Sequence, residues 1–168
     1  MAEYAASIEI EAEPAVVFEY LTTESGMTAW MGEYADLDAR PGGGFAVDIA
    51  GFPIRGEYLL VEPPHRVVVS WGVAGSDDLP PRTSTVGFTL TATPDGTRVD
   101  LLHSGLPDTE LEGHADGWAH FLPRLRRAAL GDDNELDTWR PLATDNDQND
   151  PIRNDQDSNQ RKQRGRLA

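Results

Sequence analysis

Cysteine is absent from this 168-residue sequence, and lysine occurs once, at Lys162. The absence of cysteine excludes disulfide bonds, thiolate metal ligands and cysteine nucleophiles. The sequence also has no run of 18 apolar residues, which excludes a membrane-spanning helix. Its first residues lack the basic and apolar segments of a secretory signal. We therefore expect a cytoplasmic protein with no membrane partner.

Positive charge is scarce as well. The chain carries 14 lysine and arginine residues against 29 aspartate and glutamate residues, a formal net charge of -15. This deficit excludes a nucleic-acid-binding surface, because neutralising phosphates requires clustered positive charge. All of the net charge falls in residues 1–143. Two explanations remain open for this acidic, lysine-poor composition: the codon usage of a GC-rich genome, and adaptation to high salt.

Alternating apolar and polar residues recur along the first 105 residues. This period of two is typical of half-buried strands, and breaker residues separate the segments. A proline at position 14 favours a helix start directly after the first strand. We predict short helices over 14–22 and 24–30, a mobile loop over 75–81, and strands over 7–12, 34–40, 45–49, 54–60, 67–71, 86–91 and 97–103.

A different period marks residues 111–129, where apolar side chains recur every three or four positions. This pattern predicts an amphipathic helix of about five turns. Thr109 and Glu112 have the spacing of a capping box at its start. Pro123 should remove one backbone hydrogen bond and kink the helix, and Gly131 is a natural stop.

The sequence changes character after this helix. We predict one domain over residues 1–131, a linker over 132–143 and a disordered Asp-, Asn-, Gln- and Arg-rich tail over 144–168, since such a tail buries too little apolar area to offset its ordering entropy. Trp139 and Leu142 are the residues expected to anchor the start of this extension.

The order of the predicted elements indicates the fold class. Successive strands with short turns imply an antiparallel meander. We therefore predict an α+β fold of the helix-grip kind, in which a curved antiparallel sheet of about six to seven strands surrounds a long C-terminal helix, with two short helices after the first strand. Such a sheet often leaves a cavity beneath the helix.

An ordered set of short motifs over residues 3–130 resembles the START-like superfamily, also called SRPBCC or helix-grip proteins. Within it, the sequence is most similar to the family related to the C-terminal domain of the Hsp90 ATPase activator Aha1. No single motif is specific, but their order is. The motifs are Pro14–Phe18, Trp30, Asp38–Phe45, Gly56, Pro63–Pro64, Ser70–Trp71, Thr97–Gly105 and Gly117–Trp118.

This resemblance implies a hydrophobic pocket between the sheet and the terminal helix. We predict a small-molecule binding module with an apolar ligand, no cofactor, and a monomeric or homodimeric state. One alternative is an enzyme of the polyketide cyclase type that uses the same pocket; another is an Hsp90-activator-like co-chaperone or interaction domain. The predicted pocket residues are Trp30, Phe45, Tyr58, Trp71, Phe88, Leu101, His103, Trp118 and Leu122.

His103 is the weak catalytic candidate among them. Strand alternation places it on the same face as Val99 and Leu101, which should point inward. A histidine in an apolar pocket can orient a ligand or transfer a proton. A buried histidine paired for structural reasons explains the same position, and we favour this interpretation.

Other chemical sites find no support in the sequence. His114 and His120 lie six residues apart, whereas a metal pair on one helix needs a spacing of four. The spacing of four predicts helix-surface ion pairs instead, between Glu110 and His114 and between Asp116 and His120. The Gly42–Gly44 run precedes a strand and lacks a lysine, which favours a hairpin over a phosphate-binding loop. No serine stands in a nucleophile motif.

Overall fold

The strands of the chain form one curved antiparallel sheet. The computed structural model describes residues 1–132, 134–135 and 137–141, and within them the sheet has seven strands in the order β1-β7-β6-β5-β4-β3-β2. From β2 to β7, each strand pairs with the next strand along the chain, as the predicted meander requires, and β1 pairs with β7. The strands are β1 (Ala2–Ile10), β2 (Tyr34–Leu37), β3 (Gly44–Ile49), β4 (Phe52–Glu62), β5 (Arg66–Trp71), β6 (Ser84–Thr93) and β7 (Gly96–Leu106).

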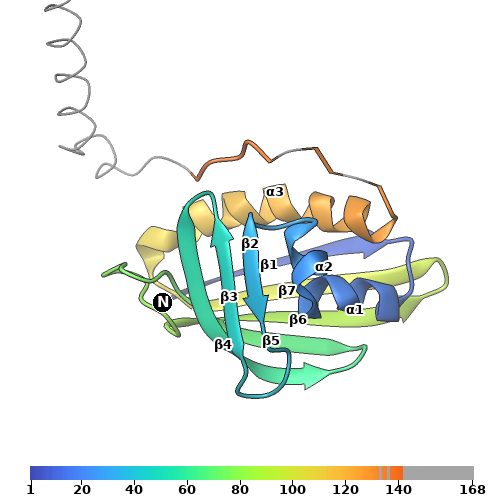
Figure 1. Ribbon diagram of the computed structural model, residues 1–168, viewed down its shortest axis with the longest axis horizontal. Helices are drawn as coiled ribbons and strands as arrows, with labels where there is room; N and C mark the ends of the chain where they lie inside the picture. Colours follow the sequence, from blue (N-terminus) through green and yellow to red (C-terminus); the bar gives the residue numbers. More distant parts are fainter. Residues whose placement is uncertain (133, 136, 142–168) are drawn as a thin grey trace, which may run out of the picture.

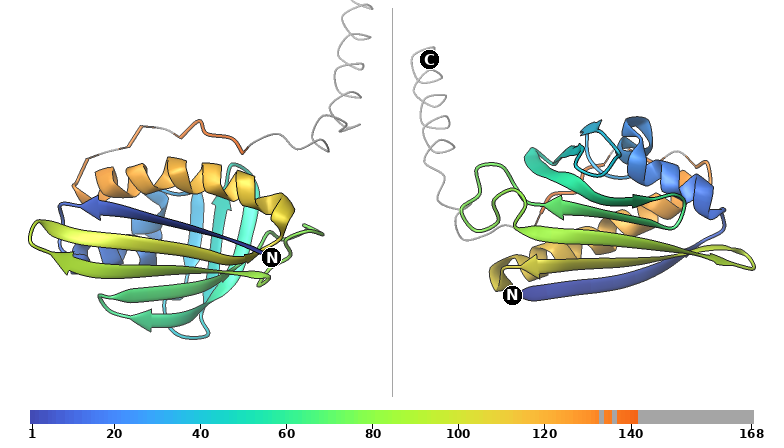
Figure 2. Two further views of the ribbon diagram at one scale, coloured as in Figure 1. Left: turned by 180° about the vertical axis from the view of Figure 1, so that it is seen from behind. Right: turned by 90° about the horizontal axis from the view of Figure 1, so that it is seen from below.

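Among the described residues, three α-helices complete the fold. The short helices α1 (Pro14–Thr22) and α2 (Glu24–Thr28) follow β1, and the long helix α3 (Leu111–Ala129) closes the domain. Figure 1 shows α3 lying across the hollow side of the sheet, and Figure 2 shows β1 running alongside it. The predicted α+β helix-grip fold is therefore confirmed. Within the described residues, no helix combines the length and apolarity needed to cross a membrane.

Strand alternation sorts the side chains as the sequence indicates. On β7, Val99, Leu101 and His103 are all buried, whereas Leu102 between them is exposed. The same alternation on β6 buries Val86 and Phe88. The inward orientation expected for His103 is thus confirmed, because β7 keeps a regular register with β6 through this region.

The N-terminal end of α3 differs from expectation, whereas the predicted stop at its C-terminal end is confirmed, because Gly131 follows the helix with a φ of 82°. A 3-10 turn, η1 (Asp108–Glu110), precedes the helix, and its N-cap residue, Glu110, makes no capping hydrogen bond through its side chain. The predicted capping box of Thr109 and Glu112 is therefore wrong, because the turn occupies the position where the cap would stand. The helix continues through Pro123 to Ala129.

One other local prediction needs correction, and another gains a detail. The strand predicted over 34–40 ends at Leu37. The segment 75–81 is a loop, as predicted, and it is anchored by the fully buried Leu79, whose backbone N–H donates to the Ser76 hydroxyl oxygen at 3.0 Å. A single apolar residue between prolines and acids carries no periodicity, so the sequence pattern did not reveal this anchor.

The glycine run at Gly42–Gly44 forms a hairpin turn between β2 and β3. Gly42 has a φ of 85°, which glycine adopts without strain. A Cβ on Gly43 would lie 1.9 Å from the Asp38 carbonyl oxygen, so only glycine fits there. The glycines therefore serve a tight turn, as predicted, and their spacing is explained without a phosphate.

Candidate ligand-binding cleft and the aromatic core beside it

The nine residues predicted to line a pocket lie together between the sheet and α3. Each of them is between 0% and 5% exposed. Their rings contact one another at centroid distances of 5.4 Å for Trp71 and Trp118, 6.0 Å for Phe88 and Trp118, and 5.7 Å for Phe45 and Tyr58. These are the separations of packed aromatic pairs. The structure thus places all nine in the hydrophobic core, and a ligand-binding role for them stays a prediction.

Two buried side-chain groups tie the short helices to this core. The Tyr58 hydroxyl donates to the Leu21 carbonyl at 3.0 Å, and the Trp30 indole N–H donates to the Tyr20 carbonyl at 2.9 Å. Burial, and secondarily the charge of Asp38, raise the pKa of Tyr58 well above its usual value. The phenol therefore remains a neutral donor, and it holds the end of α1 against the sheet.

His103 is fully paired inside the core. The Trp118 indole N–H donates to His103 Nδ1 at 3.1 Å, and His103 Nε2 lies 2.8 Å from the Ser84 hydroxyl oxygen. An indole N–H can only donate, so Nδ1 carries the lone pair and Nε2 carries the proton. The Ser84 hydroxyl oxygen therefore accepts a hydrogen bond from His103 Nε2–H, and the hydroxyl donates its own hydrogen bond to the Trp71 carbonyl at 2.9 Å.

This arrangement does not make Ser84 a nucleophile. A catalytic base must accept the serine proton, but His103 Nε2 is already protonated by the tautomer that Trp118 selects. Burial lowers the pKa of His103 to about 3, and the neighbouring His114 lowers it in the same direction. The imidazole is therefore neutral at physiological pH, and its geometry is that of a structural hydrogen-bond network.

His114 repeats the same pairing at the edge of the core. The Trp71 indole N–H donates to His114 Nε2 at 3.3 Å, and His114 Nδ1 donates to the Glu110 carbonyl at 2.9 Å. Burial lowers the pKa of His114, against opposing effects of the Glu110 backbone and carboxylate. The predicted ion pair with Glu110 is long, at 3.7 Å. His114 is chiefly a neutral partner of Trp71.

A cleft of about 600 Å³ lies apart from these nine residues. Its walls come from the ends of α1 and α2, the turn after α2, the β3–β4 turn, the C-terminal half of α3, and the segment that follows α3. None of the nine predicted pocket residues lines it. Its lining residues are Tyr20, Thr28, Ala29, Gly32, Glu33, Ile49, Ala50, Arg124, Ala128, Gly131, Asp132, Asn134, Glu135, Asp137 and Trp139.

The segment after α3, which we call the strap, consists of the described residues 132, 134–135 and 137–141. It turns back and runs along α3 (Figure 1), and it supplies one side of the cleft. Trp139 stacks on His120 at a centroid distance of 5.6 Å and an angle of 13°, and it meets Phe121 edge-on at 5.1 Å. The anchor predicted at Trp139 is confirmed, whereas Leu142 and the tail over 144–168 lie outside the described residues.

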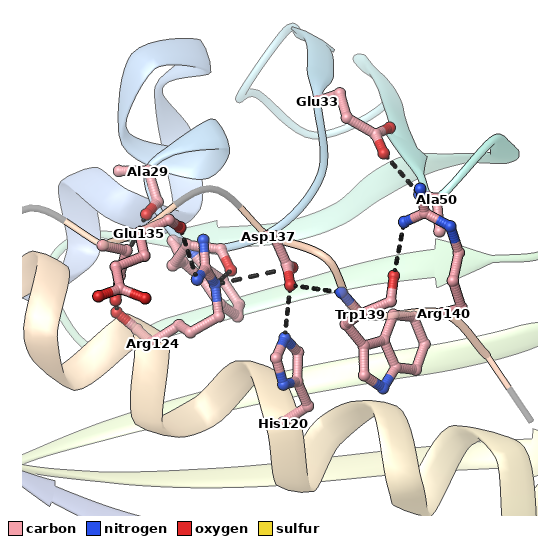
Figure 3. Close-up of polar contacts among 11 residues, drawn as sticks. Ala29, Glu33, Ala50, His120, Arg124, Glu135, Asp137, Trp139 and Arg140 are labelled. Carbon is pink, nitrogen blue, oxygen red and sulfur yellow. Dashed lines mark hydrogen bonds and ion pairs between the residues drawn. The ribbon is translucent and has the colours of Figure 1, made fainter.

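Asp137 fixes the middle of the strap (Figure 3). Its carboxylate lies 2.9 Å from His120 Nε2, accepts the Trp139 backbone N–H at 3.0 Å, and lies 3.7 Å from Arg124 Nε. His120 therefore pairs with Asp137 on the strap, and the prediction that Asp116 would be its partner is wrong. The i, i+4 spacing was correct for a helix surface, but a segment distant in the sequence covers that surface.

Arg124 and Asn134 join the strap to the rest of the cleft wall. Arg124 donates to the carbonyls of Trp30 at 3.1 Å and Glu135 at 3.2 Å. The Asn134 amide donates to the carbonyls of Ala29 at 3.1 Å and Arg124 at 2.9 Å. These bonds connect α2, α3 and the strap, so the cleft has a built wall.

Sequence reasoning missed most of this cleft. The carbonyl acceptors belong to the backbone, and Arg124, Asn134 and Glu135 carry no motif. The one available signal was Trp139, an isolated tryptophan in a polar stretch after a helix.

The fold and the buried core define the class of the protein: it is a START-like, helix-grip domain. The chain belongs to the family described as activator of Hsp90 ATPase homolog 1-like proteins, which matches residues 11–129. A comparison with curated proteins found no match.

Solved structures agree with this assignment. An AHSA1-like protein from Rhizobium etli is 36% identical, with 86% of this chain and 91% of that chain covered and a TM-score of 0.67. A protein from Mesorhizobium loti is 26% identical, with 77% of this chain and 97% of that chain covered and a TM-score of 0.69. An HSP90 activator from Plasmodium falciparum is 25% identical, with 77% of this chain and 96% of that chain covered and a TM-score of 0.64.

Proposed function

We propose that this protein is a non-catalytic small-molecule binding module whose ligand occupies the cleft beneath the strap. The observation that carries the proposal is the cleft itself, because its volume of about 600 Å³ falls within the range of small-ligand pockets. Its lining combines apolar side chains such as Ile49 with polar ones such as Asn134. We therefore expect a ligand with both apolar and polar parts, rather than the purely apolar one that the resemblance implies.

The core beside the cleft supports binding over catalysis. A proton-transfer role for His103 would require a ring nitrogen available to a substrate. Both nitrogens are engaged, by Trp118 and Ser84, and the residue is 0% exposed. The alternative of a cyclase-type enzyme acting through His103 therefore has less support than a binding role.

An interaction with Hsp90 is the second candidate function. It is favoured by the family to which the chain belongs and by the similarity to the Plasmodium falciparum HSP90 activator. The test is whether the purified protein raises the ATPase rate of Hsp90 from its own host. An ATPase rate equal to that of Hsp90 alone would contradict this candidate, and it would have no bearing on the proposal of ligand binding.

The binding proposal is tested by native mass spectrometry of the protein purified from its own host. Thr28→Trp places a large side chain in the cleft wall, and Thr91→Trp, on the exposed face of β6, is the matched control. We expect an added small-molecule mass on the natural protein and on Thr91→Trp, and its loss from Thr28→Trp. An adduct that survives in Thr28→Trp would place the ligand elsewhere, and no adduct on the natural protein would contradict the proposal.

A further inference from the structure

Charged side chains line the cleft unequally. Four acidic residues and one arginine line it, a formal excess of three negative charges. A concave site lined by one sign of charge concentrates the opposite sign from solution. The carboxylates belong to Glu33, Asp132, Glu135 and Asp137, and the guanidinium belongs to Arg124.

Arg124 is already committed to partners within the protein. It donates to the carbonyls of Trp30 and Glu135, and its Nε lies 3.7 Å from the Asp137 carboxylate. An anionic ligand would have to compete with these contacts and with the surrounding carboxylates. The single positive charge of the lining therefore does not make the cleft an anion site. Arg140, which is outside the lining, donates to the Trp139 carbonyl at 2.8 Å (Figure 3).

Asp137 is paired with His120, Arg124 and the Trp139 backbone N–H, but the other three carboxylates have fewer partners. Glu33 accepts the Ala50 backbone N–H at 3.0 Å through one oxygen. Within the described part of the chain, the side chains of Asp132 and Glu135 make no hydrogen bond or ion pair, and both are exposed residues that belong to the cleft lining. Their charges are therefore available to a ligand at little cost in existing contacts.

An aromatic ring accompanies these carboxylates. Trp139 lines the cleft, and its position is held by the stack on His120. A tryptophan ring attracts cations through its quadrupole, and it also offers a flat apolar surface. The ring and three of the four carboxylates belong to the strap, so one segment supplies both recognition features.

We propose that the cleft selects an organic cation, an ammonium or guanidinium group on an apolar or flat body, and that the strap determines this selectivity. The proposal rests on the proposed function and deepens it by assigning the ligand class. The carboxylates of Asp132, Glu135 and Glu33 would face the cationic group, while Trp139 and Ile49 would contact the body.

Three probes with the same ring and different charge test the proposal: 1-naphthylmethylammonium, 1-naphthylmethanol and 1-naphthoate. Binding to the full-length protein is measured by calorimetry. The site is read from the NMR signal of the Trp139 indole N–H, assigned with Trp139→Phe. We expect the ammonium probe to bind about tenfold more tightly than the alcohol, because several carboxylates act on it at short range, and the carboxylate probe to bind most weakly.

A charge-neutral double variant links the selectivity to the strap. Asp132→Asn with Glu135→Gln removes two cleft charges and leaves the Glu135 carbonyl in place for Arg124. Glu62→Gln with Asp95→Asn removes two exposed charges that do not line the cleft, so it is the matched control for net charge. We expect the first pair to abolish most of the preference for the ammonium probe and the second pair to retain it.

The outcomes separate the two levels of the proposal. Equal affinity for the three probes, tighter binding of 1-naphthoate, or an equal loss in both double variants would overturn cation selectivity while leaving the cleft a binding site. If no probe shifts the Trp139 signal, small-molecule binding at the cleft is itself contradicted.

Discussion

His103 shows how a residue with a catalytic appearance takes a structural role. Trp118 donates to one ring nitrogen and Ser84 accepts from the other, and the side chain has no exposure. An unpaired buried imidazole would cost the full desolvation of its polar atoms, whereas this one is satisfied at both ends. Trp71 joins the same network twice, through its carbonyl to Ser84 and through its indole to His114.

This network predicts acid sensitivity. The folded-state pKa of His103 is lowered to about 3, and that of His114 is lowered too, whereas both histidines titrate near 6.5 when unfolded. Below pH 6.5 the unfolded chain binds protons that the folded chain does not. The stability contributed by these histidines is therefore full above pH 6.5 and is lost as the pH drops below it, by about 1.4 kcal/mol per pH unit for His103 between pH 6.5 and its folded-state pKa, and in the same direction for His114.

Urea unfolding at pH 7 and pH 5 measures this effect. We expect His103→Gln to lower the free energy of unfolding at pH 7 and to reduce its change between the two pH values by about 2 kcal/mol. His65→Gln, at an exposed position of the β4–β5 turn, is the matched control. A pH dependence that is the same in His103→Gln and in the natural protein would show that His103 is protonated in the folded state.

At the scale of elements, α3 is covered on two sides. One side of the helix packs its apolar stripe on the sheet, and the strap lies along another (Figure 1). Gly117 lies under the strap, where a Cβ would meet the Trp139 ring at 3.6 Å, an ordinary van der Waals distance. The strap is thus part of the folded unit, although its composition resembles that of a linker.

Two truncations test whether the strap stabilises the domain. Ending the chain at Ala143 should leave the melting temperature nearly unchanged, because the removed sequence has no apolar stripe. Ending it at Gly131 should lower the melting temperature by a few degrees, because the Trp139 stack and the Asp137 contacts are lost. Thermal melts are compared in about 0.5 M salt, where the change in net charge matters little. Equal melting temperatures for both truncations would show that strap docking adds no stability.

Net charge acts at the scale of the whole molecule. The formal charge of -15 resides entirely in residues 1–143, so the folded domain repels itself. The two explanations of this composition differ in what salt should do. Simple screening is nearly complete once the Debye length is about 8 Å, near 0.15 M salt, whereas adaptation to high salt implies further stabilisation up to molar concentrations.

Melting temperatures in about 0.02, 0.15 and 1 M KCl distinguish the explanations. We expect most of the rise below 0.15 M, as codon usage with ordinary screening predicts. In the same KCl series, the melting temperature of a variant with several surface acids replaced by amides should rise less than that of the natural protein. A large further increase between 0.15 and 1 M would contradict this expectation and indicate salt adaptation.

The sequence by itself determined the sheet, the helices and the faces that they bury. Alternation at Val99, Leu101 and His103 and the helical period from Leu111 to Ala129 are local patterns, and each states which side of an element is apolar. Together with the order of the elements, they were sufficient for the helix-grip fold and for the aromatic core around Trp118.

Only the tertiary structure decided the partners and the cleft. Ser84 and Trp118 meet His103 from other elements, and Asp137 reaches His120 from 17 residues away. No periodicity encodes such pairings, because hydrogen-bond partners are set by how the elements pack and not by local spacing. The cleft needed parts of α1, α2, the β3–β4 turn, α3 and the strap to come together, and the strap supplies much of its polar wall.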